Sequence, residues 1–221
     1  MKILNWNTHP NNNRTSQALS MFEDLDPDII TLQEVSQEFS QEIELYAKDK
    51  SLHVNLTLDW IRRGKPYYLV TILKDIPLET KDLLYRTRRN GLLSKALGWK
   101  ETLNYSVAEL EAQTIINGHL EHHAGPITRR RQLDEMLAQL GDDTNILGVD
   151  LNQWFPFEKK SNKRLLRKHN LTDIVRGRTV SNGLCLDGII VSEDLAQLEY
   201  DFEKQFRHGS DHYPLFVEFY D

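Results

Sequence analysis

Residues 27–34 read Pro-Asp-Ile-Ile-Thr-Leu-Gln-Glu, a short apolar run that ends in two polar residues. The run is β-branched and too short for a helix, which is typical of a buried central strand. Gln33 and Glu34 follow it directly. A polar side chain at the end of a buried strand needs a hydrogen-bond partner or a chemical role. The segment therefore predicts a central strand with a candidate functional residue at its end.

The flanking segments extend this strand into an alternation of strands and helices. Residues 3–7 predict a strand, apolar residues at helical spacing over 18–25 predict a helix, and residues 39–46 predict a second amphipathic helix. A third helix should begin at Pro126 and end before Gly141. Further strands are predicted at 53–61, 67–73, 109–120, 145–149, 184–191, 195–202 and 215–219. Strands outnumber helices, and the helices can cover two sheets from outside, so we expect a layered α/β sandwich.

The bulk properties predict one soluble domain over residues 1–221, because no Gly/Ser- or Pro-rich linker divides the 221 residues. The net charge of −6 gives no global attraction to nucleic acid or anionic lipid, so a phosphate-bearing substrate must be held by a local feature such as a bound cation. The single cysteine, Cys185, suits a reducing compartment. With no signal-peptide pattern and no membrane-length apolar run, we expect a cytoplasmic protein without stable membrane insertion.

Six blocks along the chain place polar residues at the ends of apolar strands or in turns. Taken singly, each has an ordinary structural explanation, since Asp-x-Asn is common in turns and a lone histidine is more often a satisfied structural residue than a catalyst. The blocks are Lys-Ile-Leu-Asn-Trp-Asn at 2–7, Pro-Asp-Ile-Ile-Thr-Leu-Gln-Glu at 27–34, Asn-Gly-His-Leu at 117–120, Ile-Leu-Gly-Val-Asp-Leu-Asn at 146–152, Leu-Asp-Gly-Ile-Ile-Val-Ser at 186–192 and Ser-Asp-His-Tyr-Pro at 210–214.

In wording and in order, the six blocks resemble the signature of the endonuclease/exonuclease/phosphatase superfamily over almost the whole chain. The resemblance implies a four-layered α/β sandwich like that of deoxyribonuclease I, in which helices flank two packed, mixed β-sheets. It also implies an active site at the mouth between the sheets. The activity implied is hydrolysis of a phosphate ester with a divalent cation.

The chemistry of that reaction agrees with the residue types in the blocks. An attacking water must approach an anionic phosphorus, and a cation offsets the repulsion and the charge on the leaving oxygen. Oxygen ligands without any Cys/His zinc spacing favour Mg²⁺ or Mn²⁺. We expect the metal at Glu34, with Asn7 and Asp211 assisting. By the resemblance, the catalytic residues are His212, Asp150, Asn152, His119 and Asp187.

The resemblance also implies a role for each catalytic residue. Asp150 would orient or deprotonate the attacking water, and Asn152 would hold a phosphate oxygen. His212 would carry a proton or stabilise the phosphate, while Asp187 fixes its tautomer. Either Asp150 or His212 is the general base.

His119 indicates which branches of the family the chain resembles. The exonuclease III and abasic-site endonuclease branch resembles this layout with tyrosine in that block, whereas deoxyribonuclease I, sphingomyelinase-like and phosphatase branches tend to have histidine. A second histidine could protonate the leaving group. The chain departs from many nuclease members at His9, where they have an acidic or amide residue, so that metal contact is not carried over.

Two features of the sequence are candidates for substrate binding. Trp154 begins an aromatic run beside Asn152 that could stack on a base or cover a lipid or sugar portion, or could cap the core. Arg129 lies in a run of three arginines that could bind phosphate, although such runs are more often solvated helix faces.

The sequence thus favours a metal-dependent phosphodiesterase or phosphatase acting on a small molecule or lipid headgroup. The alternative is an Mg²⁺-dependent endo- or exonuclease acting on DNA or RNA, and a third hypothesis is a non-catalytic binding module. Net acidity and His119 favour the first. No protein partner is predicted.

Overall fold

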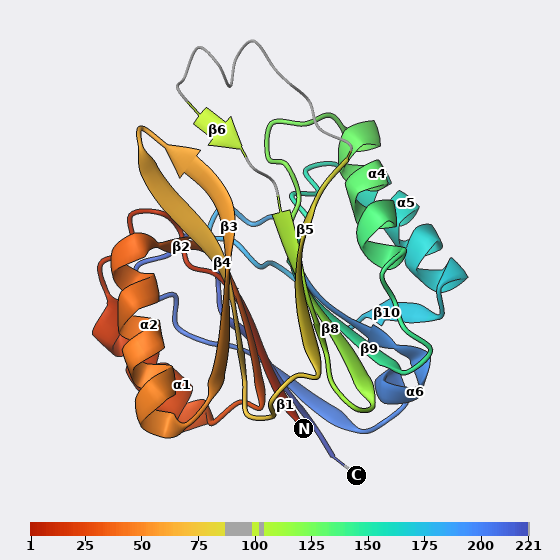
Figure 1. Cartoon of the computed structure of the whole chain (residues 1–221). Helices are drawn as coiled ribbons and strands as arrows, with labels where there is room; N and C mark the ends of the chain where they lie inside the picture. Colours follow the sequence, from red (N-terminus) through yellow and green to blue (C-terminus); the bar gives the residue numbers. More distant parts are fainter. Residues whose placement is uncertain (87–98, 102–103, 221) are drawn as a thin grey trace.

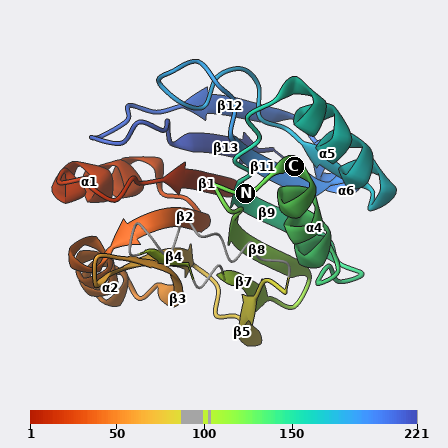
Figure 2. The same ribbon diagram turned by 90° about the horizontal axis from the view of Figure 1, so that it is seen from above.

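The computed structural model describes residues 1–86, 99–101 and 104–220. Two mixed β-sheets pack face to face, with helices on the outer face of each, which confirms the predicted four-layered sandwich (Figures 1 and 2). Within the described residues, the strand order is β12-β13-β1-β2-β4-β3-β6 in the first sheet and β10-β11-β9-β8-β7-β5 in the second.

The bounds of the elements are as follows. The strands of the first sheet are β1 (Lys2–Asn7), β2 (Ile29–Ser36), β3 (His53–Arg62), β4 (Lys65–Leu73), β6 (Trp99–Glu101), β12 (Tyr200–Lys204) and β13 (Leu215–Phe219). Those of the second are β5 (Glu79–Leu84), β7 (Asn104–Glu109), β8 (Gln113–His119), β9 (Thr144–Asp150), β10 (Leu171–Asp173) and β11 (Asp187–Ser192). The helices are α1 (Thr15–Leu25), α2 (Gln37–Lys50), α4 (Pro126–Leu137), α5 (Pro156–Lys168) and α6 (Glu193–Ala196). None of the described helices has a stretch long and apolar enough to cross a bilayer.

The central strands are buried on both faces, which explains their uninterrupted apolar runs. In β1, Ile3 belongs to the core between the sheets, whereas Leu4 packs in the core beneath α1 and α2. In β9, Ile146 faces the other sheet and Leu147 packs in the core beneath α4 and α5. Successive side chains of a strand point to opposite faces of the sheet. A strand with a core on each face therefore needs apolar residues at both its odd and its even positions.

A buried polar network joins the two sheets just beneath the mouth. The Gln33 Nε2 atom donates to Asn5 Oδ1 and to Asn117 Oδ1, both at 2.9 Å. Gly148 lies where the sheets approach each other closely, because a Cβ atom built there would lie 1.8 Å from Thr31 Oγ1. Hydrogen bonds of Gln33 Nε2 and Asn117 thus link the two sheets, although Gln33 Oε1 has no partner among the described residues, and the network fixes how the sheets are placed relative to each other.

Strand pairing brings the predicted site residues to one end of the sandwich, away from the two termini (Figure 1). Strands β1 and β2 are parallel, with Asn7 opposite Gln33. Strands β8 and β9 are also parallel, with His119 opposite Asp150, and the antiparallel β11 places Asp187 opposite Asp150. The carboxyl ends of both parallel pairs therefore meet at the mouth between the sheets.

Three expectations about the elements were wrong in detail. The run 109–120 is divided between β7 and β8 by a turn in which Leu110 N donates to Gln113 O. The segment 195–202 begins in helix α6 and only its end is a strand, because Leu195 is buried from a helical turn. The third helix ends at Leu137 rather than just before Gly141. Short apolar runs do not distinguish a strand from a helical turn, so these boundaries follow from tertiary packing.

Candidate active site

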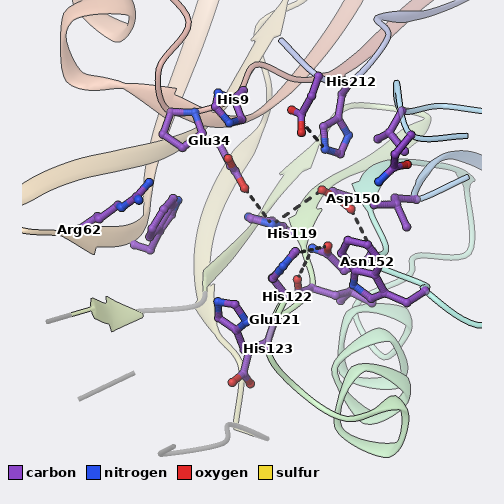
Figure 3. A pocket seen from close by; sticks show the side chains of 18 residues that line it. His9, Glu34, Arg62, His119, Glu121, His122, His123, Asp150, Asn152 and His212 are labelled. Carbon is purple, nitrogen blue, oxygen red and sulfur yellow. Dashed lines mark hydrogen bonds and ion pairs between the residues drawn. The ribbon is translucent and has the colours of Figure 1, made fainter. Parts of the chain in front are cut away.

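A cavity of about 280 Å³ opens at the mouth between the sheets (Figure 3). Its lining joins residues that are remote in sequence, namely Glu34, His119, Asp150, Asn152, Asp211 and His212. Two further predicted residues lie directly behind this lining. Asn7 donates to Asp150, and Asp187 contacts His212. The structure thus brings together every residue predicted to act in catalysis or at the metal.

His212 and Asp187 form a buried pair. The His212 Nδ1 atom lies 2.9 Å from each Asp187 carboxylate oxygen, so its Nε2 atom is the nitrogen available to the cavity. Burial alone lowers the pKa of His212, but attraction to Asp187, followed by Asp150 and Asp211, raises it to about 10. Ser210 fixes the backbone of this turn, because its hydroxyl donates to Asn7 O and accepts from His212 N.

His119 forms a second pair of the same kind, with a residue that the sequence reasoning missed. Its Nδ1 atom lies 2.8 Å from Oδ2 of Asp59, a fully buried residue on β3. The His119 Nε2 atom is buried and has no hydrogen-bond partner among the described residues; Glu34 Oε1 lies 3.6 Å and Asp150 Oδ2 3.9 Å away. Burial lowers the pKa of His119, but Asp59, Asp150 and Glu34 raise it to about 10. A protonated His119 therefore points an unused N–H into the cavity.

Glu34 reaches the cavity because β2 is irregular at this position. The pairing of β2 with β4 shifts register between Leu32 and Val35, and Glu34 has φ 55°, in the left-handed region. Such a conformation costs a non-glycine residue on the order of 1–3 kcal/mol and is concentrated at functional sites. Burial raises the pKa of Glu34, although His119 and His212 favour its charged form. The nearby carboxylates of Asp150 and Asp59 also raise this pKa.

Asp150 is held from two sides. Its Oδ2 atom accepts from Asn7 Nδ2 and its Oδ1 atom from Asn152 N, both at 2.9 Å. Asn152 has φ 44°, and its side chain donates to Leu120 O while its oxygen lies 3.0 Å from His122 Nδ1. An amide group carries two hydrogens, so one donor of Asn152 is left for a ligand.

The donor set fits a hard divalent cation. Within the described residues, one group of potential metal ligands has its atoms within 4.8 Å of one another, and it consists of Asp150, Asp187 and His212. Asp187 and His212 already bond each other, so Asp150 is the member with capacity for a metal. Its carboxylate and that of Glu34 both lie within 4 Å of His119 Nε2. Clustered carboxylates need a counterion, and oxygen donors suit Mg²⁺ or Mn²⁺.

The other residues predicted at the metal differ in their placement. Asn7 is 1% exposed, and its oxygen accepts from His9 N at 3.0 Å while its nitrogen serves Asp150. Asp211 is half-exposed at the rim, with Oδ1 4.0 Å from His212 Nε2. Asn7 thus acts on the candidate metal site through Asp150, and Asp211 can reach the same site from the solvent side.

Aromatic side chains form the walls of the cavity. Trp154 lines one side, with its ring edge-on to His122 at 5.0 Å between centroids. Trp60 lies on the lining as well and stacks on Tyr67 at 4.8 Å. Arg62 is the only Lys or Arg among the described lining residues. The cavity therefore has two tryptophan rings in its walls and few Lys or Arg side chains beside the catalytic residues.

The position of Arg129 in the structure does not agree with its predicted role in substrate binding. It is 4% exposed and lies outside the cavity lining. Its Nη2 atom lies 2.6 Å from Glu158 Oε1, and its guanidinium also donates to Ala124 O. The side chain therefore joins α4 to α5, because a buried guanidinium must be paired.

Replacing Arg129 with methionine is expected to lower the free energy of unfolding by about 3 kcal/mol, because Glu158 would be left buried without its partner. Urea denaturation of the two proteins measures the difference. Arg131→Met, at an exposed position of the same helix, is the matched control and should change stability by less than about 0.5 kcal/mol. A stable R129M protein with a raised KM would restore the substrate-binding role.

Comparison with known proteins shows which solved structures have a similar fold. No protein-family model and no curated sequence matches the chain. Solved structures do match, among them an endonuclease/exonuclease/phosphatase from Beutenbergia cavernae DSM 12333, with a TM-score of 0.79 and 14% identity over 98% of this chain and 70% of that one. An AP endonuclease from Archaeoglobus fulgidus has a TM-score of 0.74 and 16% identity, over 99% of both chains.

A third structure, an endonuclease/exonuclease/phosphatase family protein from Leptotrichia buccalis C-1013-b, covers 100% of both chains with a TM-score of 0.73 and 16% identity. These similarities extend over the whole chain, and they agree with the six sequence blocks. The chain therefore has the fold of the endonuclease/exonuclease/phosphatase superfamily.

Proposed function

We propose that this protein is a divalent-metal-dependent hydrolase of phosphate esters that acts on a small molecule or a lipid headgroup. One observation carries the proposal: two buried Asp–His pairs and the carboxylates of Glu34 and Asp150 face a single cavity. A non-catalytic scaffold has no physical need for this costly set of buried ionisable groups.

The residues around the attacking water have complementary tasks. Asp187 holds the Nδ1–H of His212, which leaves Nε2 to exchange a proton or to bond a phosphate oxygen. Asp150, oriented by Asn7 and the Asn152 amide, positions the water. Asp150 can take the proton of that water, and His212 can do so only in its neutral form, in which Nε2 has a free lone pair. The remaining donor of Asn152 bonds a non-bridging phosphate oxygen.

His119 acts on the leaving group. Its protonated Nε2 has no acceptor among the described residues, and so it can donate to the ester oxygen as the bond breaks. Glu34 and Asp150, with Asn7 and Asp211 beside them, would hold Mg²⁺ or Mn²⁺, which would offset the charge of the phosphate when bound.

The size and walls of the cavity favour a small ester. A volume of about 280 Å³ beside Trp154 and Trp60 suits a headgroup or a compact organic phosphate. The alternative, a nuclease, is favoured by the AP endonuclease from Archaeoglobus fulgidus among the similar structures. The same residues would serve either substrate, so the two functions differ in what surrounds the scissile bond.

A substrate panel with Mg²⁺ or Mn²⁺ tests the proposal. The panel comprises bis-p-nitrophenyl phosphate, inositol phosphates, sphingomyelin, plasmid DNA and single-stranded DNA and RNA. We expect hydrolysis of a small or lipid-borne ester that EDTA abolishes, with His169→Ala, at an exposed position, as the unaffected control. Selective cleavage of nucleic acid would support the alternative. A folded, metal-supplied protein that is silent on the whole panel would overturn the proposal in favour of a binding module.

Replacing Asp59 with asparagine is expected to reduce kcat by roughly 10- to 100-fold with little change in KM, because Asp59 positions and charges His119. The loss should be largest for alkyl esters and small for p-nitrophenyl esters, whose leaving group needs no proton. Steady-state kinetics on both substrate types measures this split.

A double-substitution cycle is the control for Asp59. His119→Asn should show the same leaving-group dependence, and the double variant should lose no more activity than H119N alone, because the pair acts as a unit. Equal losses on both substrate types would show that Asp59 supports the fold rather than the leaving group.

A further inference from the structure

Three large apolar side chains are exposed at the beginnings of α4 and α5. Ile127 is 72% exposed, Phe155 49% and Phe157 60%. The rings of Phe155 and Phe157 stack with centroids 5.3 Å apart, and Ile127 and Phe157 line a common hollow between the two helices. We call these three residues the apolar tip. Clustered exposed apolar residues of this kind mark a docking surface more often than scattered ones do.

The apolar tip lies at the same end of the molecule as the catalytic cavity. Strands β8 and β9 end at His119 and Asp150 in the cavity, and α4 and α5 begin a few residues later (Figure 1). Trp154, which lines the cavity, directly precedes Phe155. A surface that bound the tip would therefore lie next to the cavity opening.

Cations follow the apolar tip on both helices. On α5, Phe157, Lys160 and Arg164 lie three and four residues apart and so share one face. On α4, the exposed Arg131 follows Ile127 by four residues, whereas Arg130 donates to Ser161 O of α5. A surface that approached the tip would therefore meet cations one turn behind it.

Helix α5 is strongly cationic in an otherwise acidic chain. Six cations and one carboxylate give it a formal charge of +5, whereas the whole chain carries −6, so the other residues carry −11. The carboxylate, Glu158, is buried against Arg129. No carboxylate of the described residues lies within 4.0 Å of an α5 cation. The α5 cations are Lys159, Lys160, Lys163, Arg164, Arg167 and Lys168.

We infer that this end of the molecule docks on an anionic lipid bilayer, with the apolar tip among the headgroups and Arg131, Lys160 and Arg164 facing lipid phosphates. Exposed apolar side chains backed by cations are the combination that binds the interface of an anionic membrane. The aliphatic, exposed side chain of Ile127 suits acyl chains, whereas single-stranded nucleic acid prefers aromatic platforms within a groove. The inference rests on the proposed function in one respect. If the protein hydrolyses phosphate esters, docking at a bilayer implies that its substrate is a phosphoester presented at a lipid surface.

Flotation with vesicles in EDTA tests docking separately from catalysis. We expect wild-type protein to bind phosphatidylcholine vesicles that contain phosphatidylserine, to bind pure phosphatidylcholine weakly, and to dissociate at about 1 M salt. The triple variant Ile127→Ser, Phe155→Ser, Phe157→Ser should bind at least roughly tenfold more weakly. The control Ile76→Ser, Leu78→Ser removes residues that are 83% and 76% exposed at the opposite end and should bind like wild type.

A second pair of variants tests the cations behind the apolar tip, with the same change in net charge in both variants. Arg131→Gln with Lys160→Gln lowers the charge by two, as does Lys48→Glu on the exposed surface of α2. The first variant should weaken vesicle binding by roughly tenfold and the second by much less, since the effect of a charge decays within a Debye length of about 8 Å.

Three results would overturn the inference: no binding of anionic vesicles by wild type, equal binding by the triple variant, or tip-dependent binding of single-stranded oligonucleotide without vesicle binding. Hydrolysis of soluble bis-p-nitrophenyl phosphate by wild-type protein separates the two proposals. If wild type hydrolyses this ester but does not bind anionic vesicles, docking alone fails. If vesicles are bound but no phosphoester is hydrolysed, the proposed function fails.

Discussion

Replacing His212 with alanine is expected to lower kcat/KM for phosphoester hydrolysis by on the order of 10³-fold. The imidazole is the cavity-facing half of the Asp187–His212 pair, and its removal takes away both a proton carrier and a charge-assisted donor to the phosphate. The fold should persist, because the hydrogen bonds of this turn run through the His212 backbone to Ser210 and Trp6. Steady-state kinetics at saturating Mg²⁺ measures the loss.

Two further measurements show whether His212 acts chemically. Added imidazole should partly restore the activity of H212A, because the cavity opens at the mouth of the sandwich and can admit the small molecule. Asp187→Asn should cost a comparable factor, and the double variant little more, since the two residues act together. Full activity in H212A, or strictly additive losses, would contradict the assignment of the pair.

The layered fold could be predicted because the central strands have to be apolar on both faces. The alternation of Ile3 with Leu4 and of Ile146 with Leu147 serves two cores at once, and this requirement is visible in the sequence. The positions of Glu34, Asp150 and His212 around one cavity follow from the resemblance of the six blocks to one family and from the parallel pairing of β8 with β9.

Asp59 could not be predicted from local patterning. In β3, Asn55, Thr57 and Asp59 alternate with Val54, Leu56 and Leu58, and such a strand normally has a solvated polar face. In the structure, Thr57 and Asp59 are fully buried and Asp59 reaches His119 of the other sheet. The packing of the two sheets, rather than the alternation, decides that the polar side faces inward.

The structural role of Arg129, on helix α4, also could not be predicted from local sequence patterning. Arg129 and Arg131 are equivalent in the sequence, but two residues correspond to about 200° around a helix, so they point in nearly opposite directions. Arg129 is buried against Glu158 and Arg131 is exposed. Only the position of α5 beside α4 determines which arginine is structural, and α5 lies about thirty residues farther along the chain.

Replacing Glu34 with glutamine is expected to weaken Mn²⁺ binding by more than roughly tenfold and to lower kcat by on the order of 10²- to 10³-fold. Glutamine keeps the size of the side chain but removes a charge that the cation needs. Isothermal titration calorimetry with Mn²⁺ measures the affinity. Glu38→Gln, an exposed carboxylate four residues away on α2, is the matched control and should leave binding and activity unchanged.

Thermal unfolding gives an independent test of the same substitution. In wild type, the burial of Glu34 outweighs the attraction of its carboxylate to His119 and His212 and raises its pKa, so the metal-free protein should be less stable than metal-free E34Q. Mn²⁺ should raise the Tm of wild type, because it binds the folded state, and should leave the Tm of E34Q nearly unchanged. A variant that keeps wild-type Mn²⁺ affinity and the full Tm increase would show that Asp150 holds the cation without Glu34.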